Sequence, residues 1–256
     1  MVAGHTPRRR RPMASFADAP VRNRILAALL ATEYKNLLPK LEHVALTRGQ
    51  VIYRADQDIE EVYFPEEAVV AMVDSMDDGR TVEVGLIGRE GIVGINIVLG
   101  GVATPDKAIV QLAGGAMRMT SRDLRKELRF GSPLQPLLLA YTRTFLAVIS
   151  QSVACCQYHS VEQRLARWLL TMNDYVGSRE FPMDHKSIAL MLGARREGVT
   201  QAAGKLQTAA LISYRRGHIS VLDGRGLGKK ACECCRFIRQ QYQRLYGDLP
   251  RLLSRK

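Results

Sequence analysis

The stretch that decides the fold is MDHKSIALMLGARREGVTQ, which occupies positions 183–201. Ile188 and Leu192 fall on one face of a predicted helix, and Ala189 is small enough for a second helix to cross closely. Gly193 marks the turn, because a residue at this point must tolerate a positive φ. The apolar face then resumes at Val199, Ala202 and Leu206. The pattern predicts a helix-turn-helix.

The second helix of this unit opens with polar side chains that face outward. They are Arg195, Arg196, Glu197, Thr200 and Gln201. Arginine, glutamate and glutamine can reach base edges in the major groove, and arginine and threonine can also contact phosphates. The set is therefore able to read DNA.

A predicted β-hairpin follows the second helix directly. Leu211–Leu222 reads as two short strands around an Arg216-Gly217 turn. A hairpin in this place is typical of a wing, whose basic tip of Arg215, Arg216 and His218 can contact a phosphate backbone. The alternative is an ordinary α+β domain with a charged surface hairpin.

The distribution of charge agrees with a DNA-binding C-terminal part. The net charge of the 256-residue chain is +12. Residues 159–256 hold 18 Lys and Arg against 8 Asp and Glu, whereas residues 23–158 hold 14 against 16. Basic charge thus gathers where phosphates would be neutralised.

The overall composition is that of a soluble, cytoplasmic protein with two domains. We find no signal peptide and no apolar run that would span a bilayer, so no membrane partner is expected. The histidines His43, His159, His185 and His218 lie in different elements without a nucleophile beside them. The sequence therefore indicates no catalytic constellation, and we do not expect an enzyme.

The chain divides into five parts, with an α+β fold. Residues 1–19 form a basic tail that cannot bury a core and is expected to be disordered. In residues 20–131 a helix over Val21–Leu38 precedes many short strands, which predict an antiparallel barrel or jelly roll. The expected strands are Val44–Leu46, Val51–Arg54, Val62–Phe64, Val69–Met76, Thr81–Ile87 and Ala108–Leu112.

Residues 132–158 predict a long helix with a heptad seam. Its apolar positions are spaced by alternating fours and threes, at Leu134, Leu138, Tyr141, Phe145, Val148 and Ser152. We interpret this seam as a dimer interface, because a two-fold pair of winged helices reads two half-sites. The alternative is a helix that packs on its own β domain.

The last two parts are the winged helix-turn-helix domain, residues 159–224, and a C-terminal helical extension, residues 225–256. An amphipathic helix over Val161–Tyr175 is expected to support the helix-turn-helix. In the extension, one helix is expected over roughly Lys229–Leu253.

This order of barrel, long helix and winged helix-turn-helix resembles the Crp/Fnr superfamily of bacterial transcription regulators. The most specific stretches are Val161–Leu170, which reads VEQRLARWLL, and the helix-turn-helix. The resemblance implies a barrel with a cyclic-nucleotide-binding fold, a homodimer on double-stranded DNA and, for an activator, contact with RNA polymerase.

The resemblance also assigns roles on the second helix of the helix-turn-helix. The family commonly has an Arg-Glu pair there, with another Arg four residues after the Glu. Arg196 and Glu197 match the pair, and Gln201 replaces the second Arg, so these three are the expected base contacts. Arg195 and Thr200 are expected to contact phosphates.

The sensor departs from the members that bind cyclic AMP. Those members hold the cyclic phosphate with a Gly-Glu pair and an Arg that precedes Ser or Thr and Ala. Here Asp106 stands at the place of that Arg, and a carboxylate would repel the phosphate. We expect an unknown effector in a pocket rimmed by Arg89, Glu90, Asp106 and Lys107, or else an ordinary solvated loop.

The five cysteines offer a second, different function. Iron-sulfur members of the superfamily use cysteines near the amino terminus, and this chain has none before Cys155. Cys232, Cys234 and Cys235 could serve a thiol- or metal-responsive sensor, but no second pair of ligands is evident. The sequence alone therefore predicts no metal and no cofactor, with Cys155 and Cys156 as small packing residues.

Overall fold

The computed structural model describes residues 21–78, 81–128 and 132–253. The predicted basic tail, residues 1–19, lies outside the described residues. At the start of the described chain, the expected single helix is divided into α1 (Arg24–Ala27) and α2 (Ala31–Leu37). Leu30 between them is extended, and its N–H donates to the Glu33 carboxylate, which begins a new helix.

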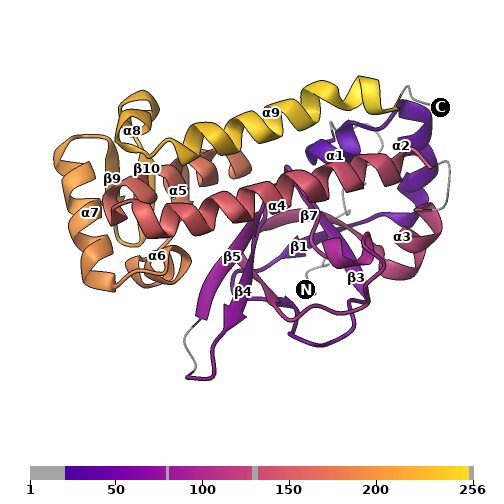
Figure 1. The fold of residues 1–256 in the computed structure, drawn as a ribbon, viewed down its shortest axis with the longest axis horizontal. Helices are drawn as coiled ribbons and strands as arrows, with labels where there is room; N and C mark the ends of the chain where they lie inside the picture. The colour runs from indigo at the N-terminus through magenta and orange to yellow at the C-terminus, as the bar shows by residue number, and fades with distance from the viewer. Residues whose placement is uncertain (1–20, 79–80, 129–131, 254–256) are drawn as a thin grey trace, which may run out of the picture.

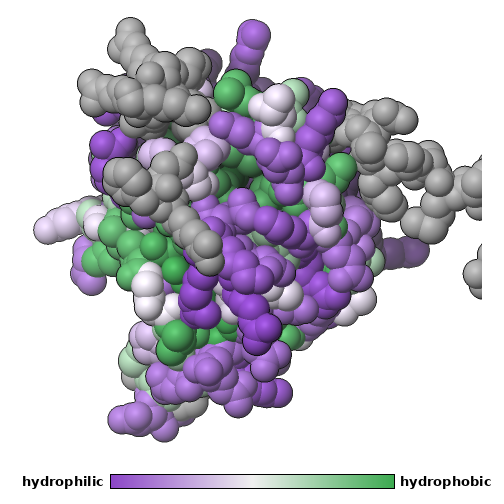
Figure 2. Space-filling view, turned by 90° about the vertical axis from the view of Figure 1, so that its right-hand side faces the viewer, coloured by the Kyte–Doolittle hydropathy of each residue, from purple (hydrophilic) through white to green (hydrophobic). Residues whose placement is uncertain are grey.

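The sensor consists of two antiparallel sheets, as the sequence predicts. One has the strand order β1-β7-β3 and the other β2-β6-β4-β5. The strands are β1 (Glu42–Leu46), β2 (Val51–Tyr53), β3 (Glu61–Pro65), β4 (Val69–Ser75), β5 (Thr81–Ile87), β6 (Lys107–Leu112) and β7 (Gly114–Thr120). Short helices η2 (Leu38–Lys40), η3 (Ile95–Ile97) and α3 (Ser121–Glu127) complete it. Figure 2 views the end of the molecule that holds α1 to α3, where hydrophilic side chains surround smaller apolar areas.

Strand β7 is absent from the sequence-based expectation, although it lies at the centre of its sheet. It begins with Gly114 and Gly115, which contribute no side chain to a hydrophobic pattern. Gly114 is needed because a Cβ there would lie 2.5 Å from the backbone nitrogen of Ala68. The close approach of the chain requires glycine at the start of β7, and glycine gives no hydrophobic pattern from which the strand could be predicted.

The long helix α4 (Leu134–Tyr158) runs along the molecule, and α9 (Cys234–Leu253) lies beside it (Figure 1). Its heptad seam is buried within the chain: Tyr141 is fully covered and stacks on Phe145, with ring centroids 5.8 Å apart. Phe145 in turn packs on Gly85 of β5. The interpretation of this seam as the dimer interface is therefore corrected: Leu134, Leu138, Tyr141, Phe145 and Val148 belong to the chain's own core.

A different stripe of α4 is exposed. Leu139, Leu146 and Val153 recur every seven residues, with 45%, 57% and 62% of their surfaces exposed. Arg143 and Ser150 fall between them at heptad spacing and are also exposed. Leu139, Leu146 and Val153 thus form an exposed apolar stripe along α4.

By length and composition alone, α4 could cross a membrane, since it has 25 residues and contains an 18-residue window with a mean hydropathy of 1.3. The expectation that no apolar run is long enough was therefore wrong. Many of its apolar residues are needed because they pack on the sensor. Tyr141 and Phe145 lie at the centre of that contact.

The winged domain is an antiparallel three-stranded sheet with helices packed around it. Its elements are α5 (Val161–Val176), β8 (Glu180–Pro182), α6 (His185–Leu192), α7 (Arg196–Thr208), β9 (Ile212–Arg215), β10 (His218–Val221) and α8 (Gly224–Lys230). The single helix expected over Lys229–Leu253 is instead two, α8 and α9. Ala231 has extended backbone angles, and Cys232 and Glu233 lie in the break.

Candidate nucleic-acid interface

The helix-turn-helix forms where the sequence predicts it. Asp184 caps α6, with its carboxylate accepting the Ser187 N–H at 2.8 Å. Gly193 ends α6 with φ 55°, the left-handed conformation that glycine adopts without strain. Ile188 and Leu192 of α6 and Val199 of α7 are buried together. The turn and this packing therefore fix the orientation of α7 relative to α6.

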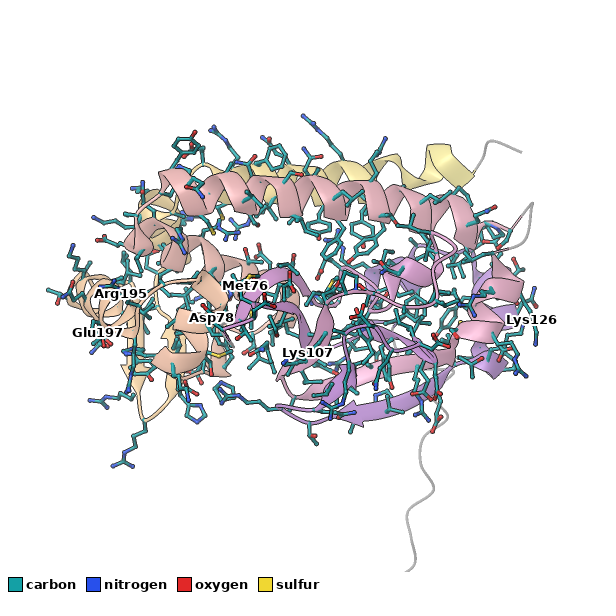
Figure 3. The ribbon with its side chains drawn as sticks, turned by 60° about the horizontal axis from the view of Figure 1, so that its bottom comes forward. Met76, Asp78, Lys107, Lys126, Arg195 and Glu197 are labelled. Carbon is teal, nitrogen blue, oxygen red and sulfur yellow. The ribbon has the colours of Figure 1, made fainter. Side chains whose placement is uncertain are left out.

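The N-terminal part of α7 presents its polar side chains to solvent. Arg195, Arg196, Glu197 and Gln201 are all exposed. Figure 3 shows Arg195 and Glu197 at one end of the molecule, far from Lys126 at the other. Within the described part of the chain, the side chains of Arg196, Glu197 and Gln201 have no hydrogen-bond or ion-pair partner. Their bonding capacity is free for a ligand.

Thr200 is positioned differently from these residues. Its hydroxyl donates to the Arg196 carbonyl at 3.0 Å and lies 3.0 Å from Nδ1 of His185. The His185 ring also stacks on Tyr214 of β9, with centroids 4.2 Å apart. Burial and the charge of Arg196 lower the pKa of His185. Sequence reasoning missed His185 because its role depends on contacts from three elements.

The wing has the tight turn that the sequence predicts. Arg216 and Gly217 have φ of 48° and 77°, and β9 pairs with β10 on either side. Positive φ at both central residues is the geometry that gives a two-residue hairpin its right-handed twist. Arg215, Arg216 and His218 are exposed at the tip. Three groups that can donate to phosphate therefore lie beside α7.

The sensor contacts this domain directly. A groove of about 1060 Å³ lies between the β4–β5 hairpin and the helix-turn-helix, and Met76, Thr81 and Arg195 are among its lining residues. Figure 3 shows Met76 and Asp78 at the side of the sensor that faces this domain. Gly193 packs near Val82 of β5. A change in the position of the β4–β5 hairpin can therefore alter the position of the start of α7.

The predicted effector residues fall into two groups. Arg89 and Glu90 line a cavity of about 280 Å³, whose other walls come from α1, α5 and α9. The lining of this cavity does not include Asp106 or Lys107. Asp106 accepts a hydrogen bond from Thr104, and Lys107 pairs with Val73 at the edge of β6. The sequence could not show this separation, because it depends on how the two loops fold.

The Glu90 carboxyl group is buried between the sensor and the C-terminal helix. It accepts the Gly88 N–H at 3.0 Å, and the Tyr246 hydroxyl donates to the Glu90 carbonyl. Burial is the main cause that raises the pKa of Glu90 to about 8. The charge of Arg24 lowers this pKa, but less. Residue 90 therefore lies where α9 closes on the sensor.

Four possible metal ligands meet at the far end of α4. The ligand atoms of Cys155, His159, Cys232 and Cys234 all lie within 4.8 Å of one another. Cys235 is not among them; it packs in the main core. Cys155 and His159 thus supply the second pair of ligands that the sequence does not reveal.

The two-sheet domain, the long connecting helix and the winged helix-turn-helix are the elements that the resemblance to the Crp/Fnr superfamily implies. The family model of the Crp-like helix-turn-helix domain matches residues 163–229. The resemblance inferred from the sequence is therefore confirmed for the DNA-binding domain. No curated protein matches the chain in sequence.

Solved structures confirm the fold over most of the chain. FixK2 from Bradyrhizobium japonicum superposes with a TM-score of 0.65 at 18% identity, covering 75% of this chain and 98% of its own. A CRP-family regulator from Thermus thermophilus superposes with a TM-score of 0.61 at 19% identity, and the match covers 73% of this chain and 96% of the regulator. The c-di-GMP responsive regulator CLP from Xanthomonas campestris superposes with a TM-score of 0.59 at 15% identity, and the match covers 75% of this chain and 99% of CLP.

Proposed function

We propose that the protein is a dimeric, sequence-specific DNA-binding regulator of the Crp/Fnr type. The observation that carries this proposal is the exposed set of Arg196, Glu197 and Gln201, three base-reading side chains without partners at the start of α7. Arg196 would grip a guanine, Glu197 would accept from a cytosine amino group and Gln201 would pair with adenine. Such a protein acts in the cytoplasm, and an activator would also contact RNA polymerase.

Phosphate contacts would flank these base contacts. Arg195 at the start of α7 and the wing residues Arg215, Arg216 and His218 are exposed on the same domain. They would position the domain on the duplex without reading its sequence. Thr200 would have to give up its hydrogen bond to the Arg196 carbonyl in order to donate to a phosphate. Its better-supported role is to hold His185 against α7.

The dimer would form through the exposed stripe of α4. Leu139, Leu146 and Val153 recur every seven residues on a 25-residue helix, so they would supply one of the two heptad positions of a helix-helix contact, with Arg143 and Ser150 at the other. Two parallel copies of α4 would place the two winged domains at the same end. A pair of α7 helices could then read half-sites about 34–36 Å apart.

Any small-molecule effector would bind near Arg89. The cavity beside Arg89 and Glu90 touches the sensor, α5 and α9 at once, so its occupancy can bias the position of the winged domain. Cyclic AMP in the usual orientation is disfavoured, because Asp106 offers a carboxylate where a cation would be required. A solved structure of similar fold, CLP from Xanthomonas campestris, is described as c-di-GMP responsive, which is compatible with an effector other than cyclic AMP.

Selection of random DNA duplexes by the purified full-length protein tests the proposal, at a low and a higher salt concentration. We expect a consensus with two-fold symmetry that is retained at the higher salt. Phosphate contacts alone would give binding without a consensus that falls steeply with salt. That second result would contradict sequence-specific reading by α7.

A further inference from the structure

Three thiols and one imidazole meet where the end of α4 lies against the connection between α8 and α9. Cys155 lies in the last turn of α4, and His159, four positions later, is the extended residue that ends the helix. Cys232 and Cys234 approach from the opposite side, on either side of Glu233. The two pairs are separated by more than seventy residues in the chain, since Cys155 and Cys232 are 77 positions apart.

Two of the distances within the cluster match those between ligands around a tetrahedral metal ion. Sγ of Cys155 lies 3.5 Å from Sγ of Cys232, and Sγ of Cys234 lies 3.6 Å from Nδ1 of His159. Bonds of about 2.3 Å to sulfur and about 2.0 Å to nitrogen place tetrahedral ligand atoms roughly 3.5–3.8 Å apart. Little movement would be needed to surround a cation.

Groups around the cluster are arranged as they are around metal ligands. Nε2 of His159 lies 3.2 Å from the Glu233 carboxylate, which would orient the ring and leave Nδ1 free to coordinate. Nε2 of Gln151 donates to Sγ of Cys234 at 3.1 Å. A hydrogen bond of this kind stabilises negative charge on a thiolate.

A buried positive charge also lies close to the cluster. The charge of Arg167 acts on Cys155 and Cys232, and its Nε is buried without a hydrogen-bond partner among the described residues. A buried cation is costly unless an opposite charge is near. Three thiolates, a neutral imidazole and a divalent ion would place one net negative charge near Arg167, whose charge also acts on the buried Glu83.

We propose that Cys155, His159, Cys232 and Cys234 form a closed structural site for a divalent metal ion of the zinc type. Thiolate and imidazole are the ligands that zinc prefers, and four protein ligands leave no position open for a substrate. On binding, three thiols release their protons to solvent and the oxidation state of the metal does not change. The proposal does not depend on DNA binding.

Bound metal would fasten the C-terminal helix to the long helix. His159 directly precedes Ser160, which caps α5, so the site lies at the joint between α4 and the winged domain. Cys234 is the first residue of α9, which runs back to the sensor, where the Tyr246 hydroxyl donates to the Glu90 carbonyl. The metal would therefore hold one end of a connection between the two domains.

Metal analysis of the tag-free, full-length protein tests the site. The protein is reduced, incubated with Zn²⁺ and freed of excess metal, and we expect one zinc per chain. Replacement by Co²⁺ should give thiolate-to-cobalt charge-transfer bands and the d–d bands of a tetrahedral ion. Cys155→Ser, Cys232→Ser and Cys234→Ser should each lose the stoichiometric metal and these bands.

Matched controls lie next to the ligands in the sequence. Cys156→Ser changes an exposed thiol and Cys235→Ser a buried one outside the cluster, and both should keep one zinc per chain. Glu233→Gln keeps every ligand but should weaken zinc binding about 10–100-fold. Circular dichroism of each variant shows that it is folded.

Two results would overturn the proposal. One is metal content far below one per chain in the folded wild-type protein after reduction and incubation with Zn²⁺, whether its thiols stay free or Cys155 and Cys232 then oxidise to a disulfide. The other is equal metal content in the wild type and in folded Cys155→Ser and Cys234→Ser variants.

Discussion

The guanidinium of Arg48 lies 2.9 Å from the carboxylate of Asp184. Arg48 belongs to the turn between β1 and β2 of the sensor, and Asp184 caps the first helix of the helix-turn-helix. Arg48 also donates to the Ser187 hydroxyl at 3.0 Å. The sensor is thus joined to the residue that begins the helix-turn-helix.

This pair predicts unequal effects of its two substitutions on stability. Arg48→Ala removes an ion pair whose side chains are 39% and 49% exposed, so it should cost less than about 1 kcal/mol of unfolding free energy. Asp184→Ala also removes the helix cap and should cost about 1–2 kcal/mol. Urea unfolding measures both, and a larger loss for Arg48→Ala would contradict this division.

Glu90 predicts a pH dependence of stability. The folded chain keeps this proton until about pH 8, whereas the unfolded chain loses it near the ordinary pKa of 4.5. Between these values the unfolded state binds fewer protons, so the free energy of unfolding falls as the pH rises. Glu90→Gln removes this effect, and its stability relative to the wild type should grow by at least about 1 kcal/mol from acid to mildly alkaline pH.

Chemical unfolding at several pH values measures this difference. Glu60→Gln, which changes an exposed carboxylate of the same sensor, is the matched control. A relative stability of Glu90→Gln that stays constant with pH, or that falls, would show that Glu90 is already ionised in the folded protein.

The exposed stripe of α4 predicts which substitution breaks the dimer. Leu146→Glu places a charge on a side chain that is 57% exposed in the single chain, so the fold should survive while self-association is lost. Leu99→Glu, at a sensor residue that is 59% exposed, should leave association unchanged. Analytical ultracentrifugation distinguishes the two, and a dimeric Leu146→Glu protein would place the interface elsewhere.

The wing predicts a change in salt dependence. Arg215→Ala removes one exposed charge next to the turn while the backbone of β9 stays extended. Binding should weaken by a similar factor on every DNA sequence, and the slope of log affinity against log salt should fall by about 1. Arg236→Ala, on the exposed side of α9, is the control. A loss restricted to one base sequence would instead make Arg215 a base contact.

The helix-turn-helix could be predicted from the sequence because its signals are local. The apolar period around Ile188 and Val199 and the turn at Gly193 all lie within one short stretch. The same reasoning failed on α4, since a heptad pattern shows that a face is apolar but not what covers it. Tyr141 and Phe145 are covered by the chain itself, and the free stripe at Leu146 carries the weaker pattern.

The cysteine cluster could not be predicted for a different reason. Cys155 and Cys232 meet only because α9 folds back along α4, and no local period reports such a contact. The cavity beside Glu90 has the same origin, as its walls come from four separate elements. Sites that form because the C-terminal helix folds back along α4 therefore cannot be predicted from local sequence patterns and are seen only in the structure.

The most direct test of the account is the affinity of Arg196→Ala for the selected DNA site and for each single-base variant of that site. The side chain is exposed and without a partner, so the protein should remain folded. We predict a loss of about 1–3 kcal/mol on the preferred site and relaxed discrimination at one base position. An equal loss on every sequence would mean that Arg196 contacts phosphate, and it would contradict base reading by the start of α7.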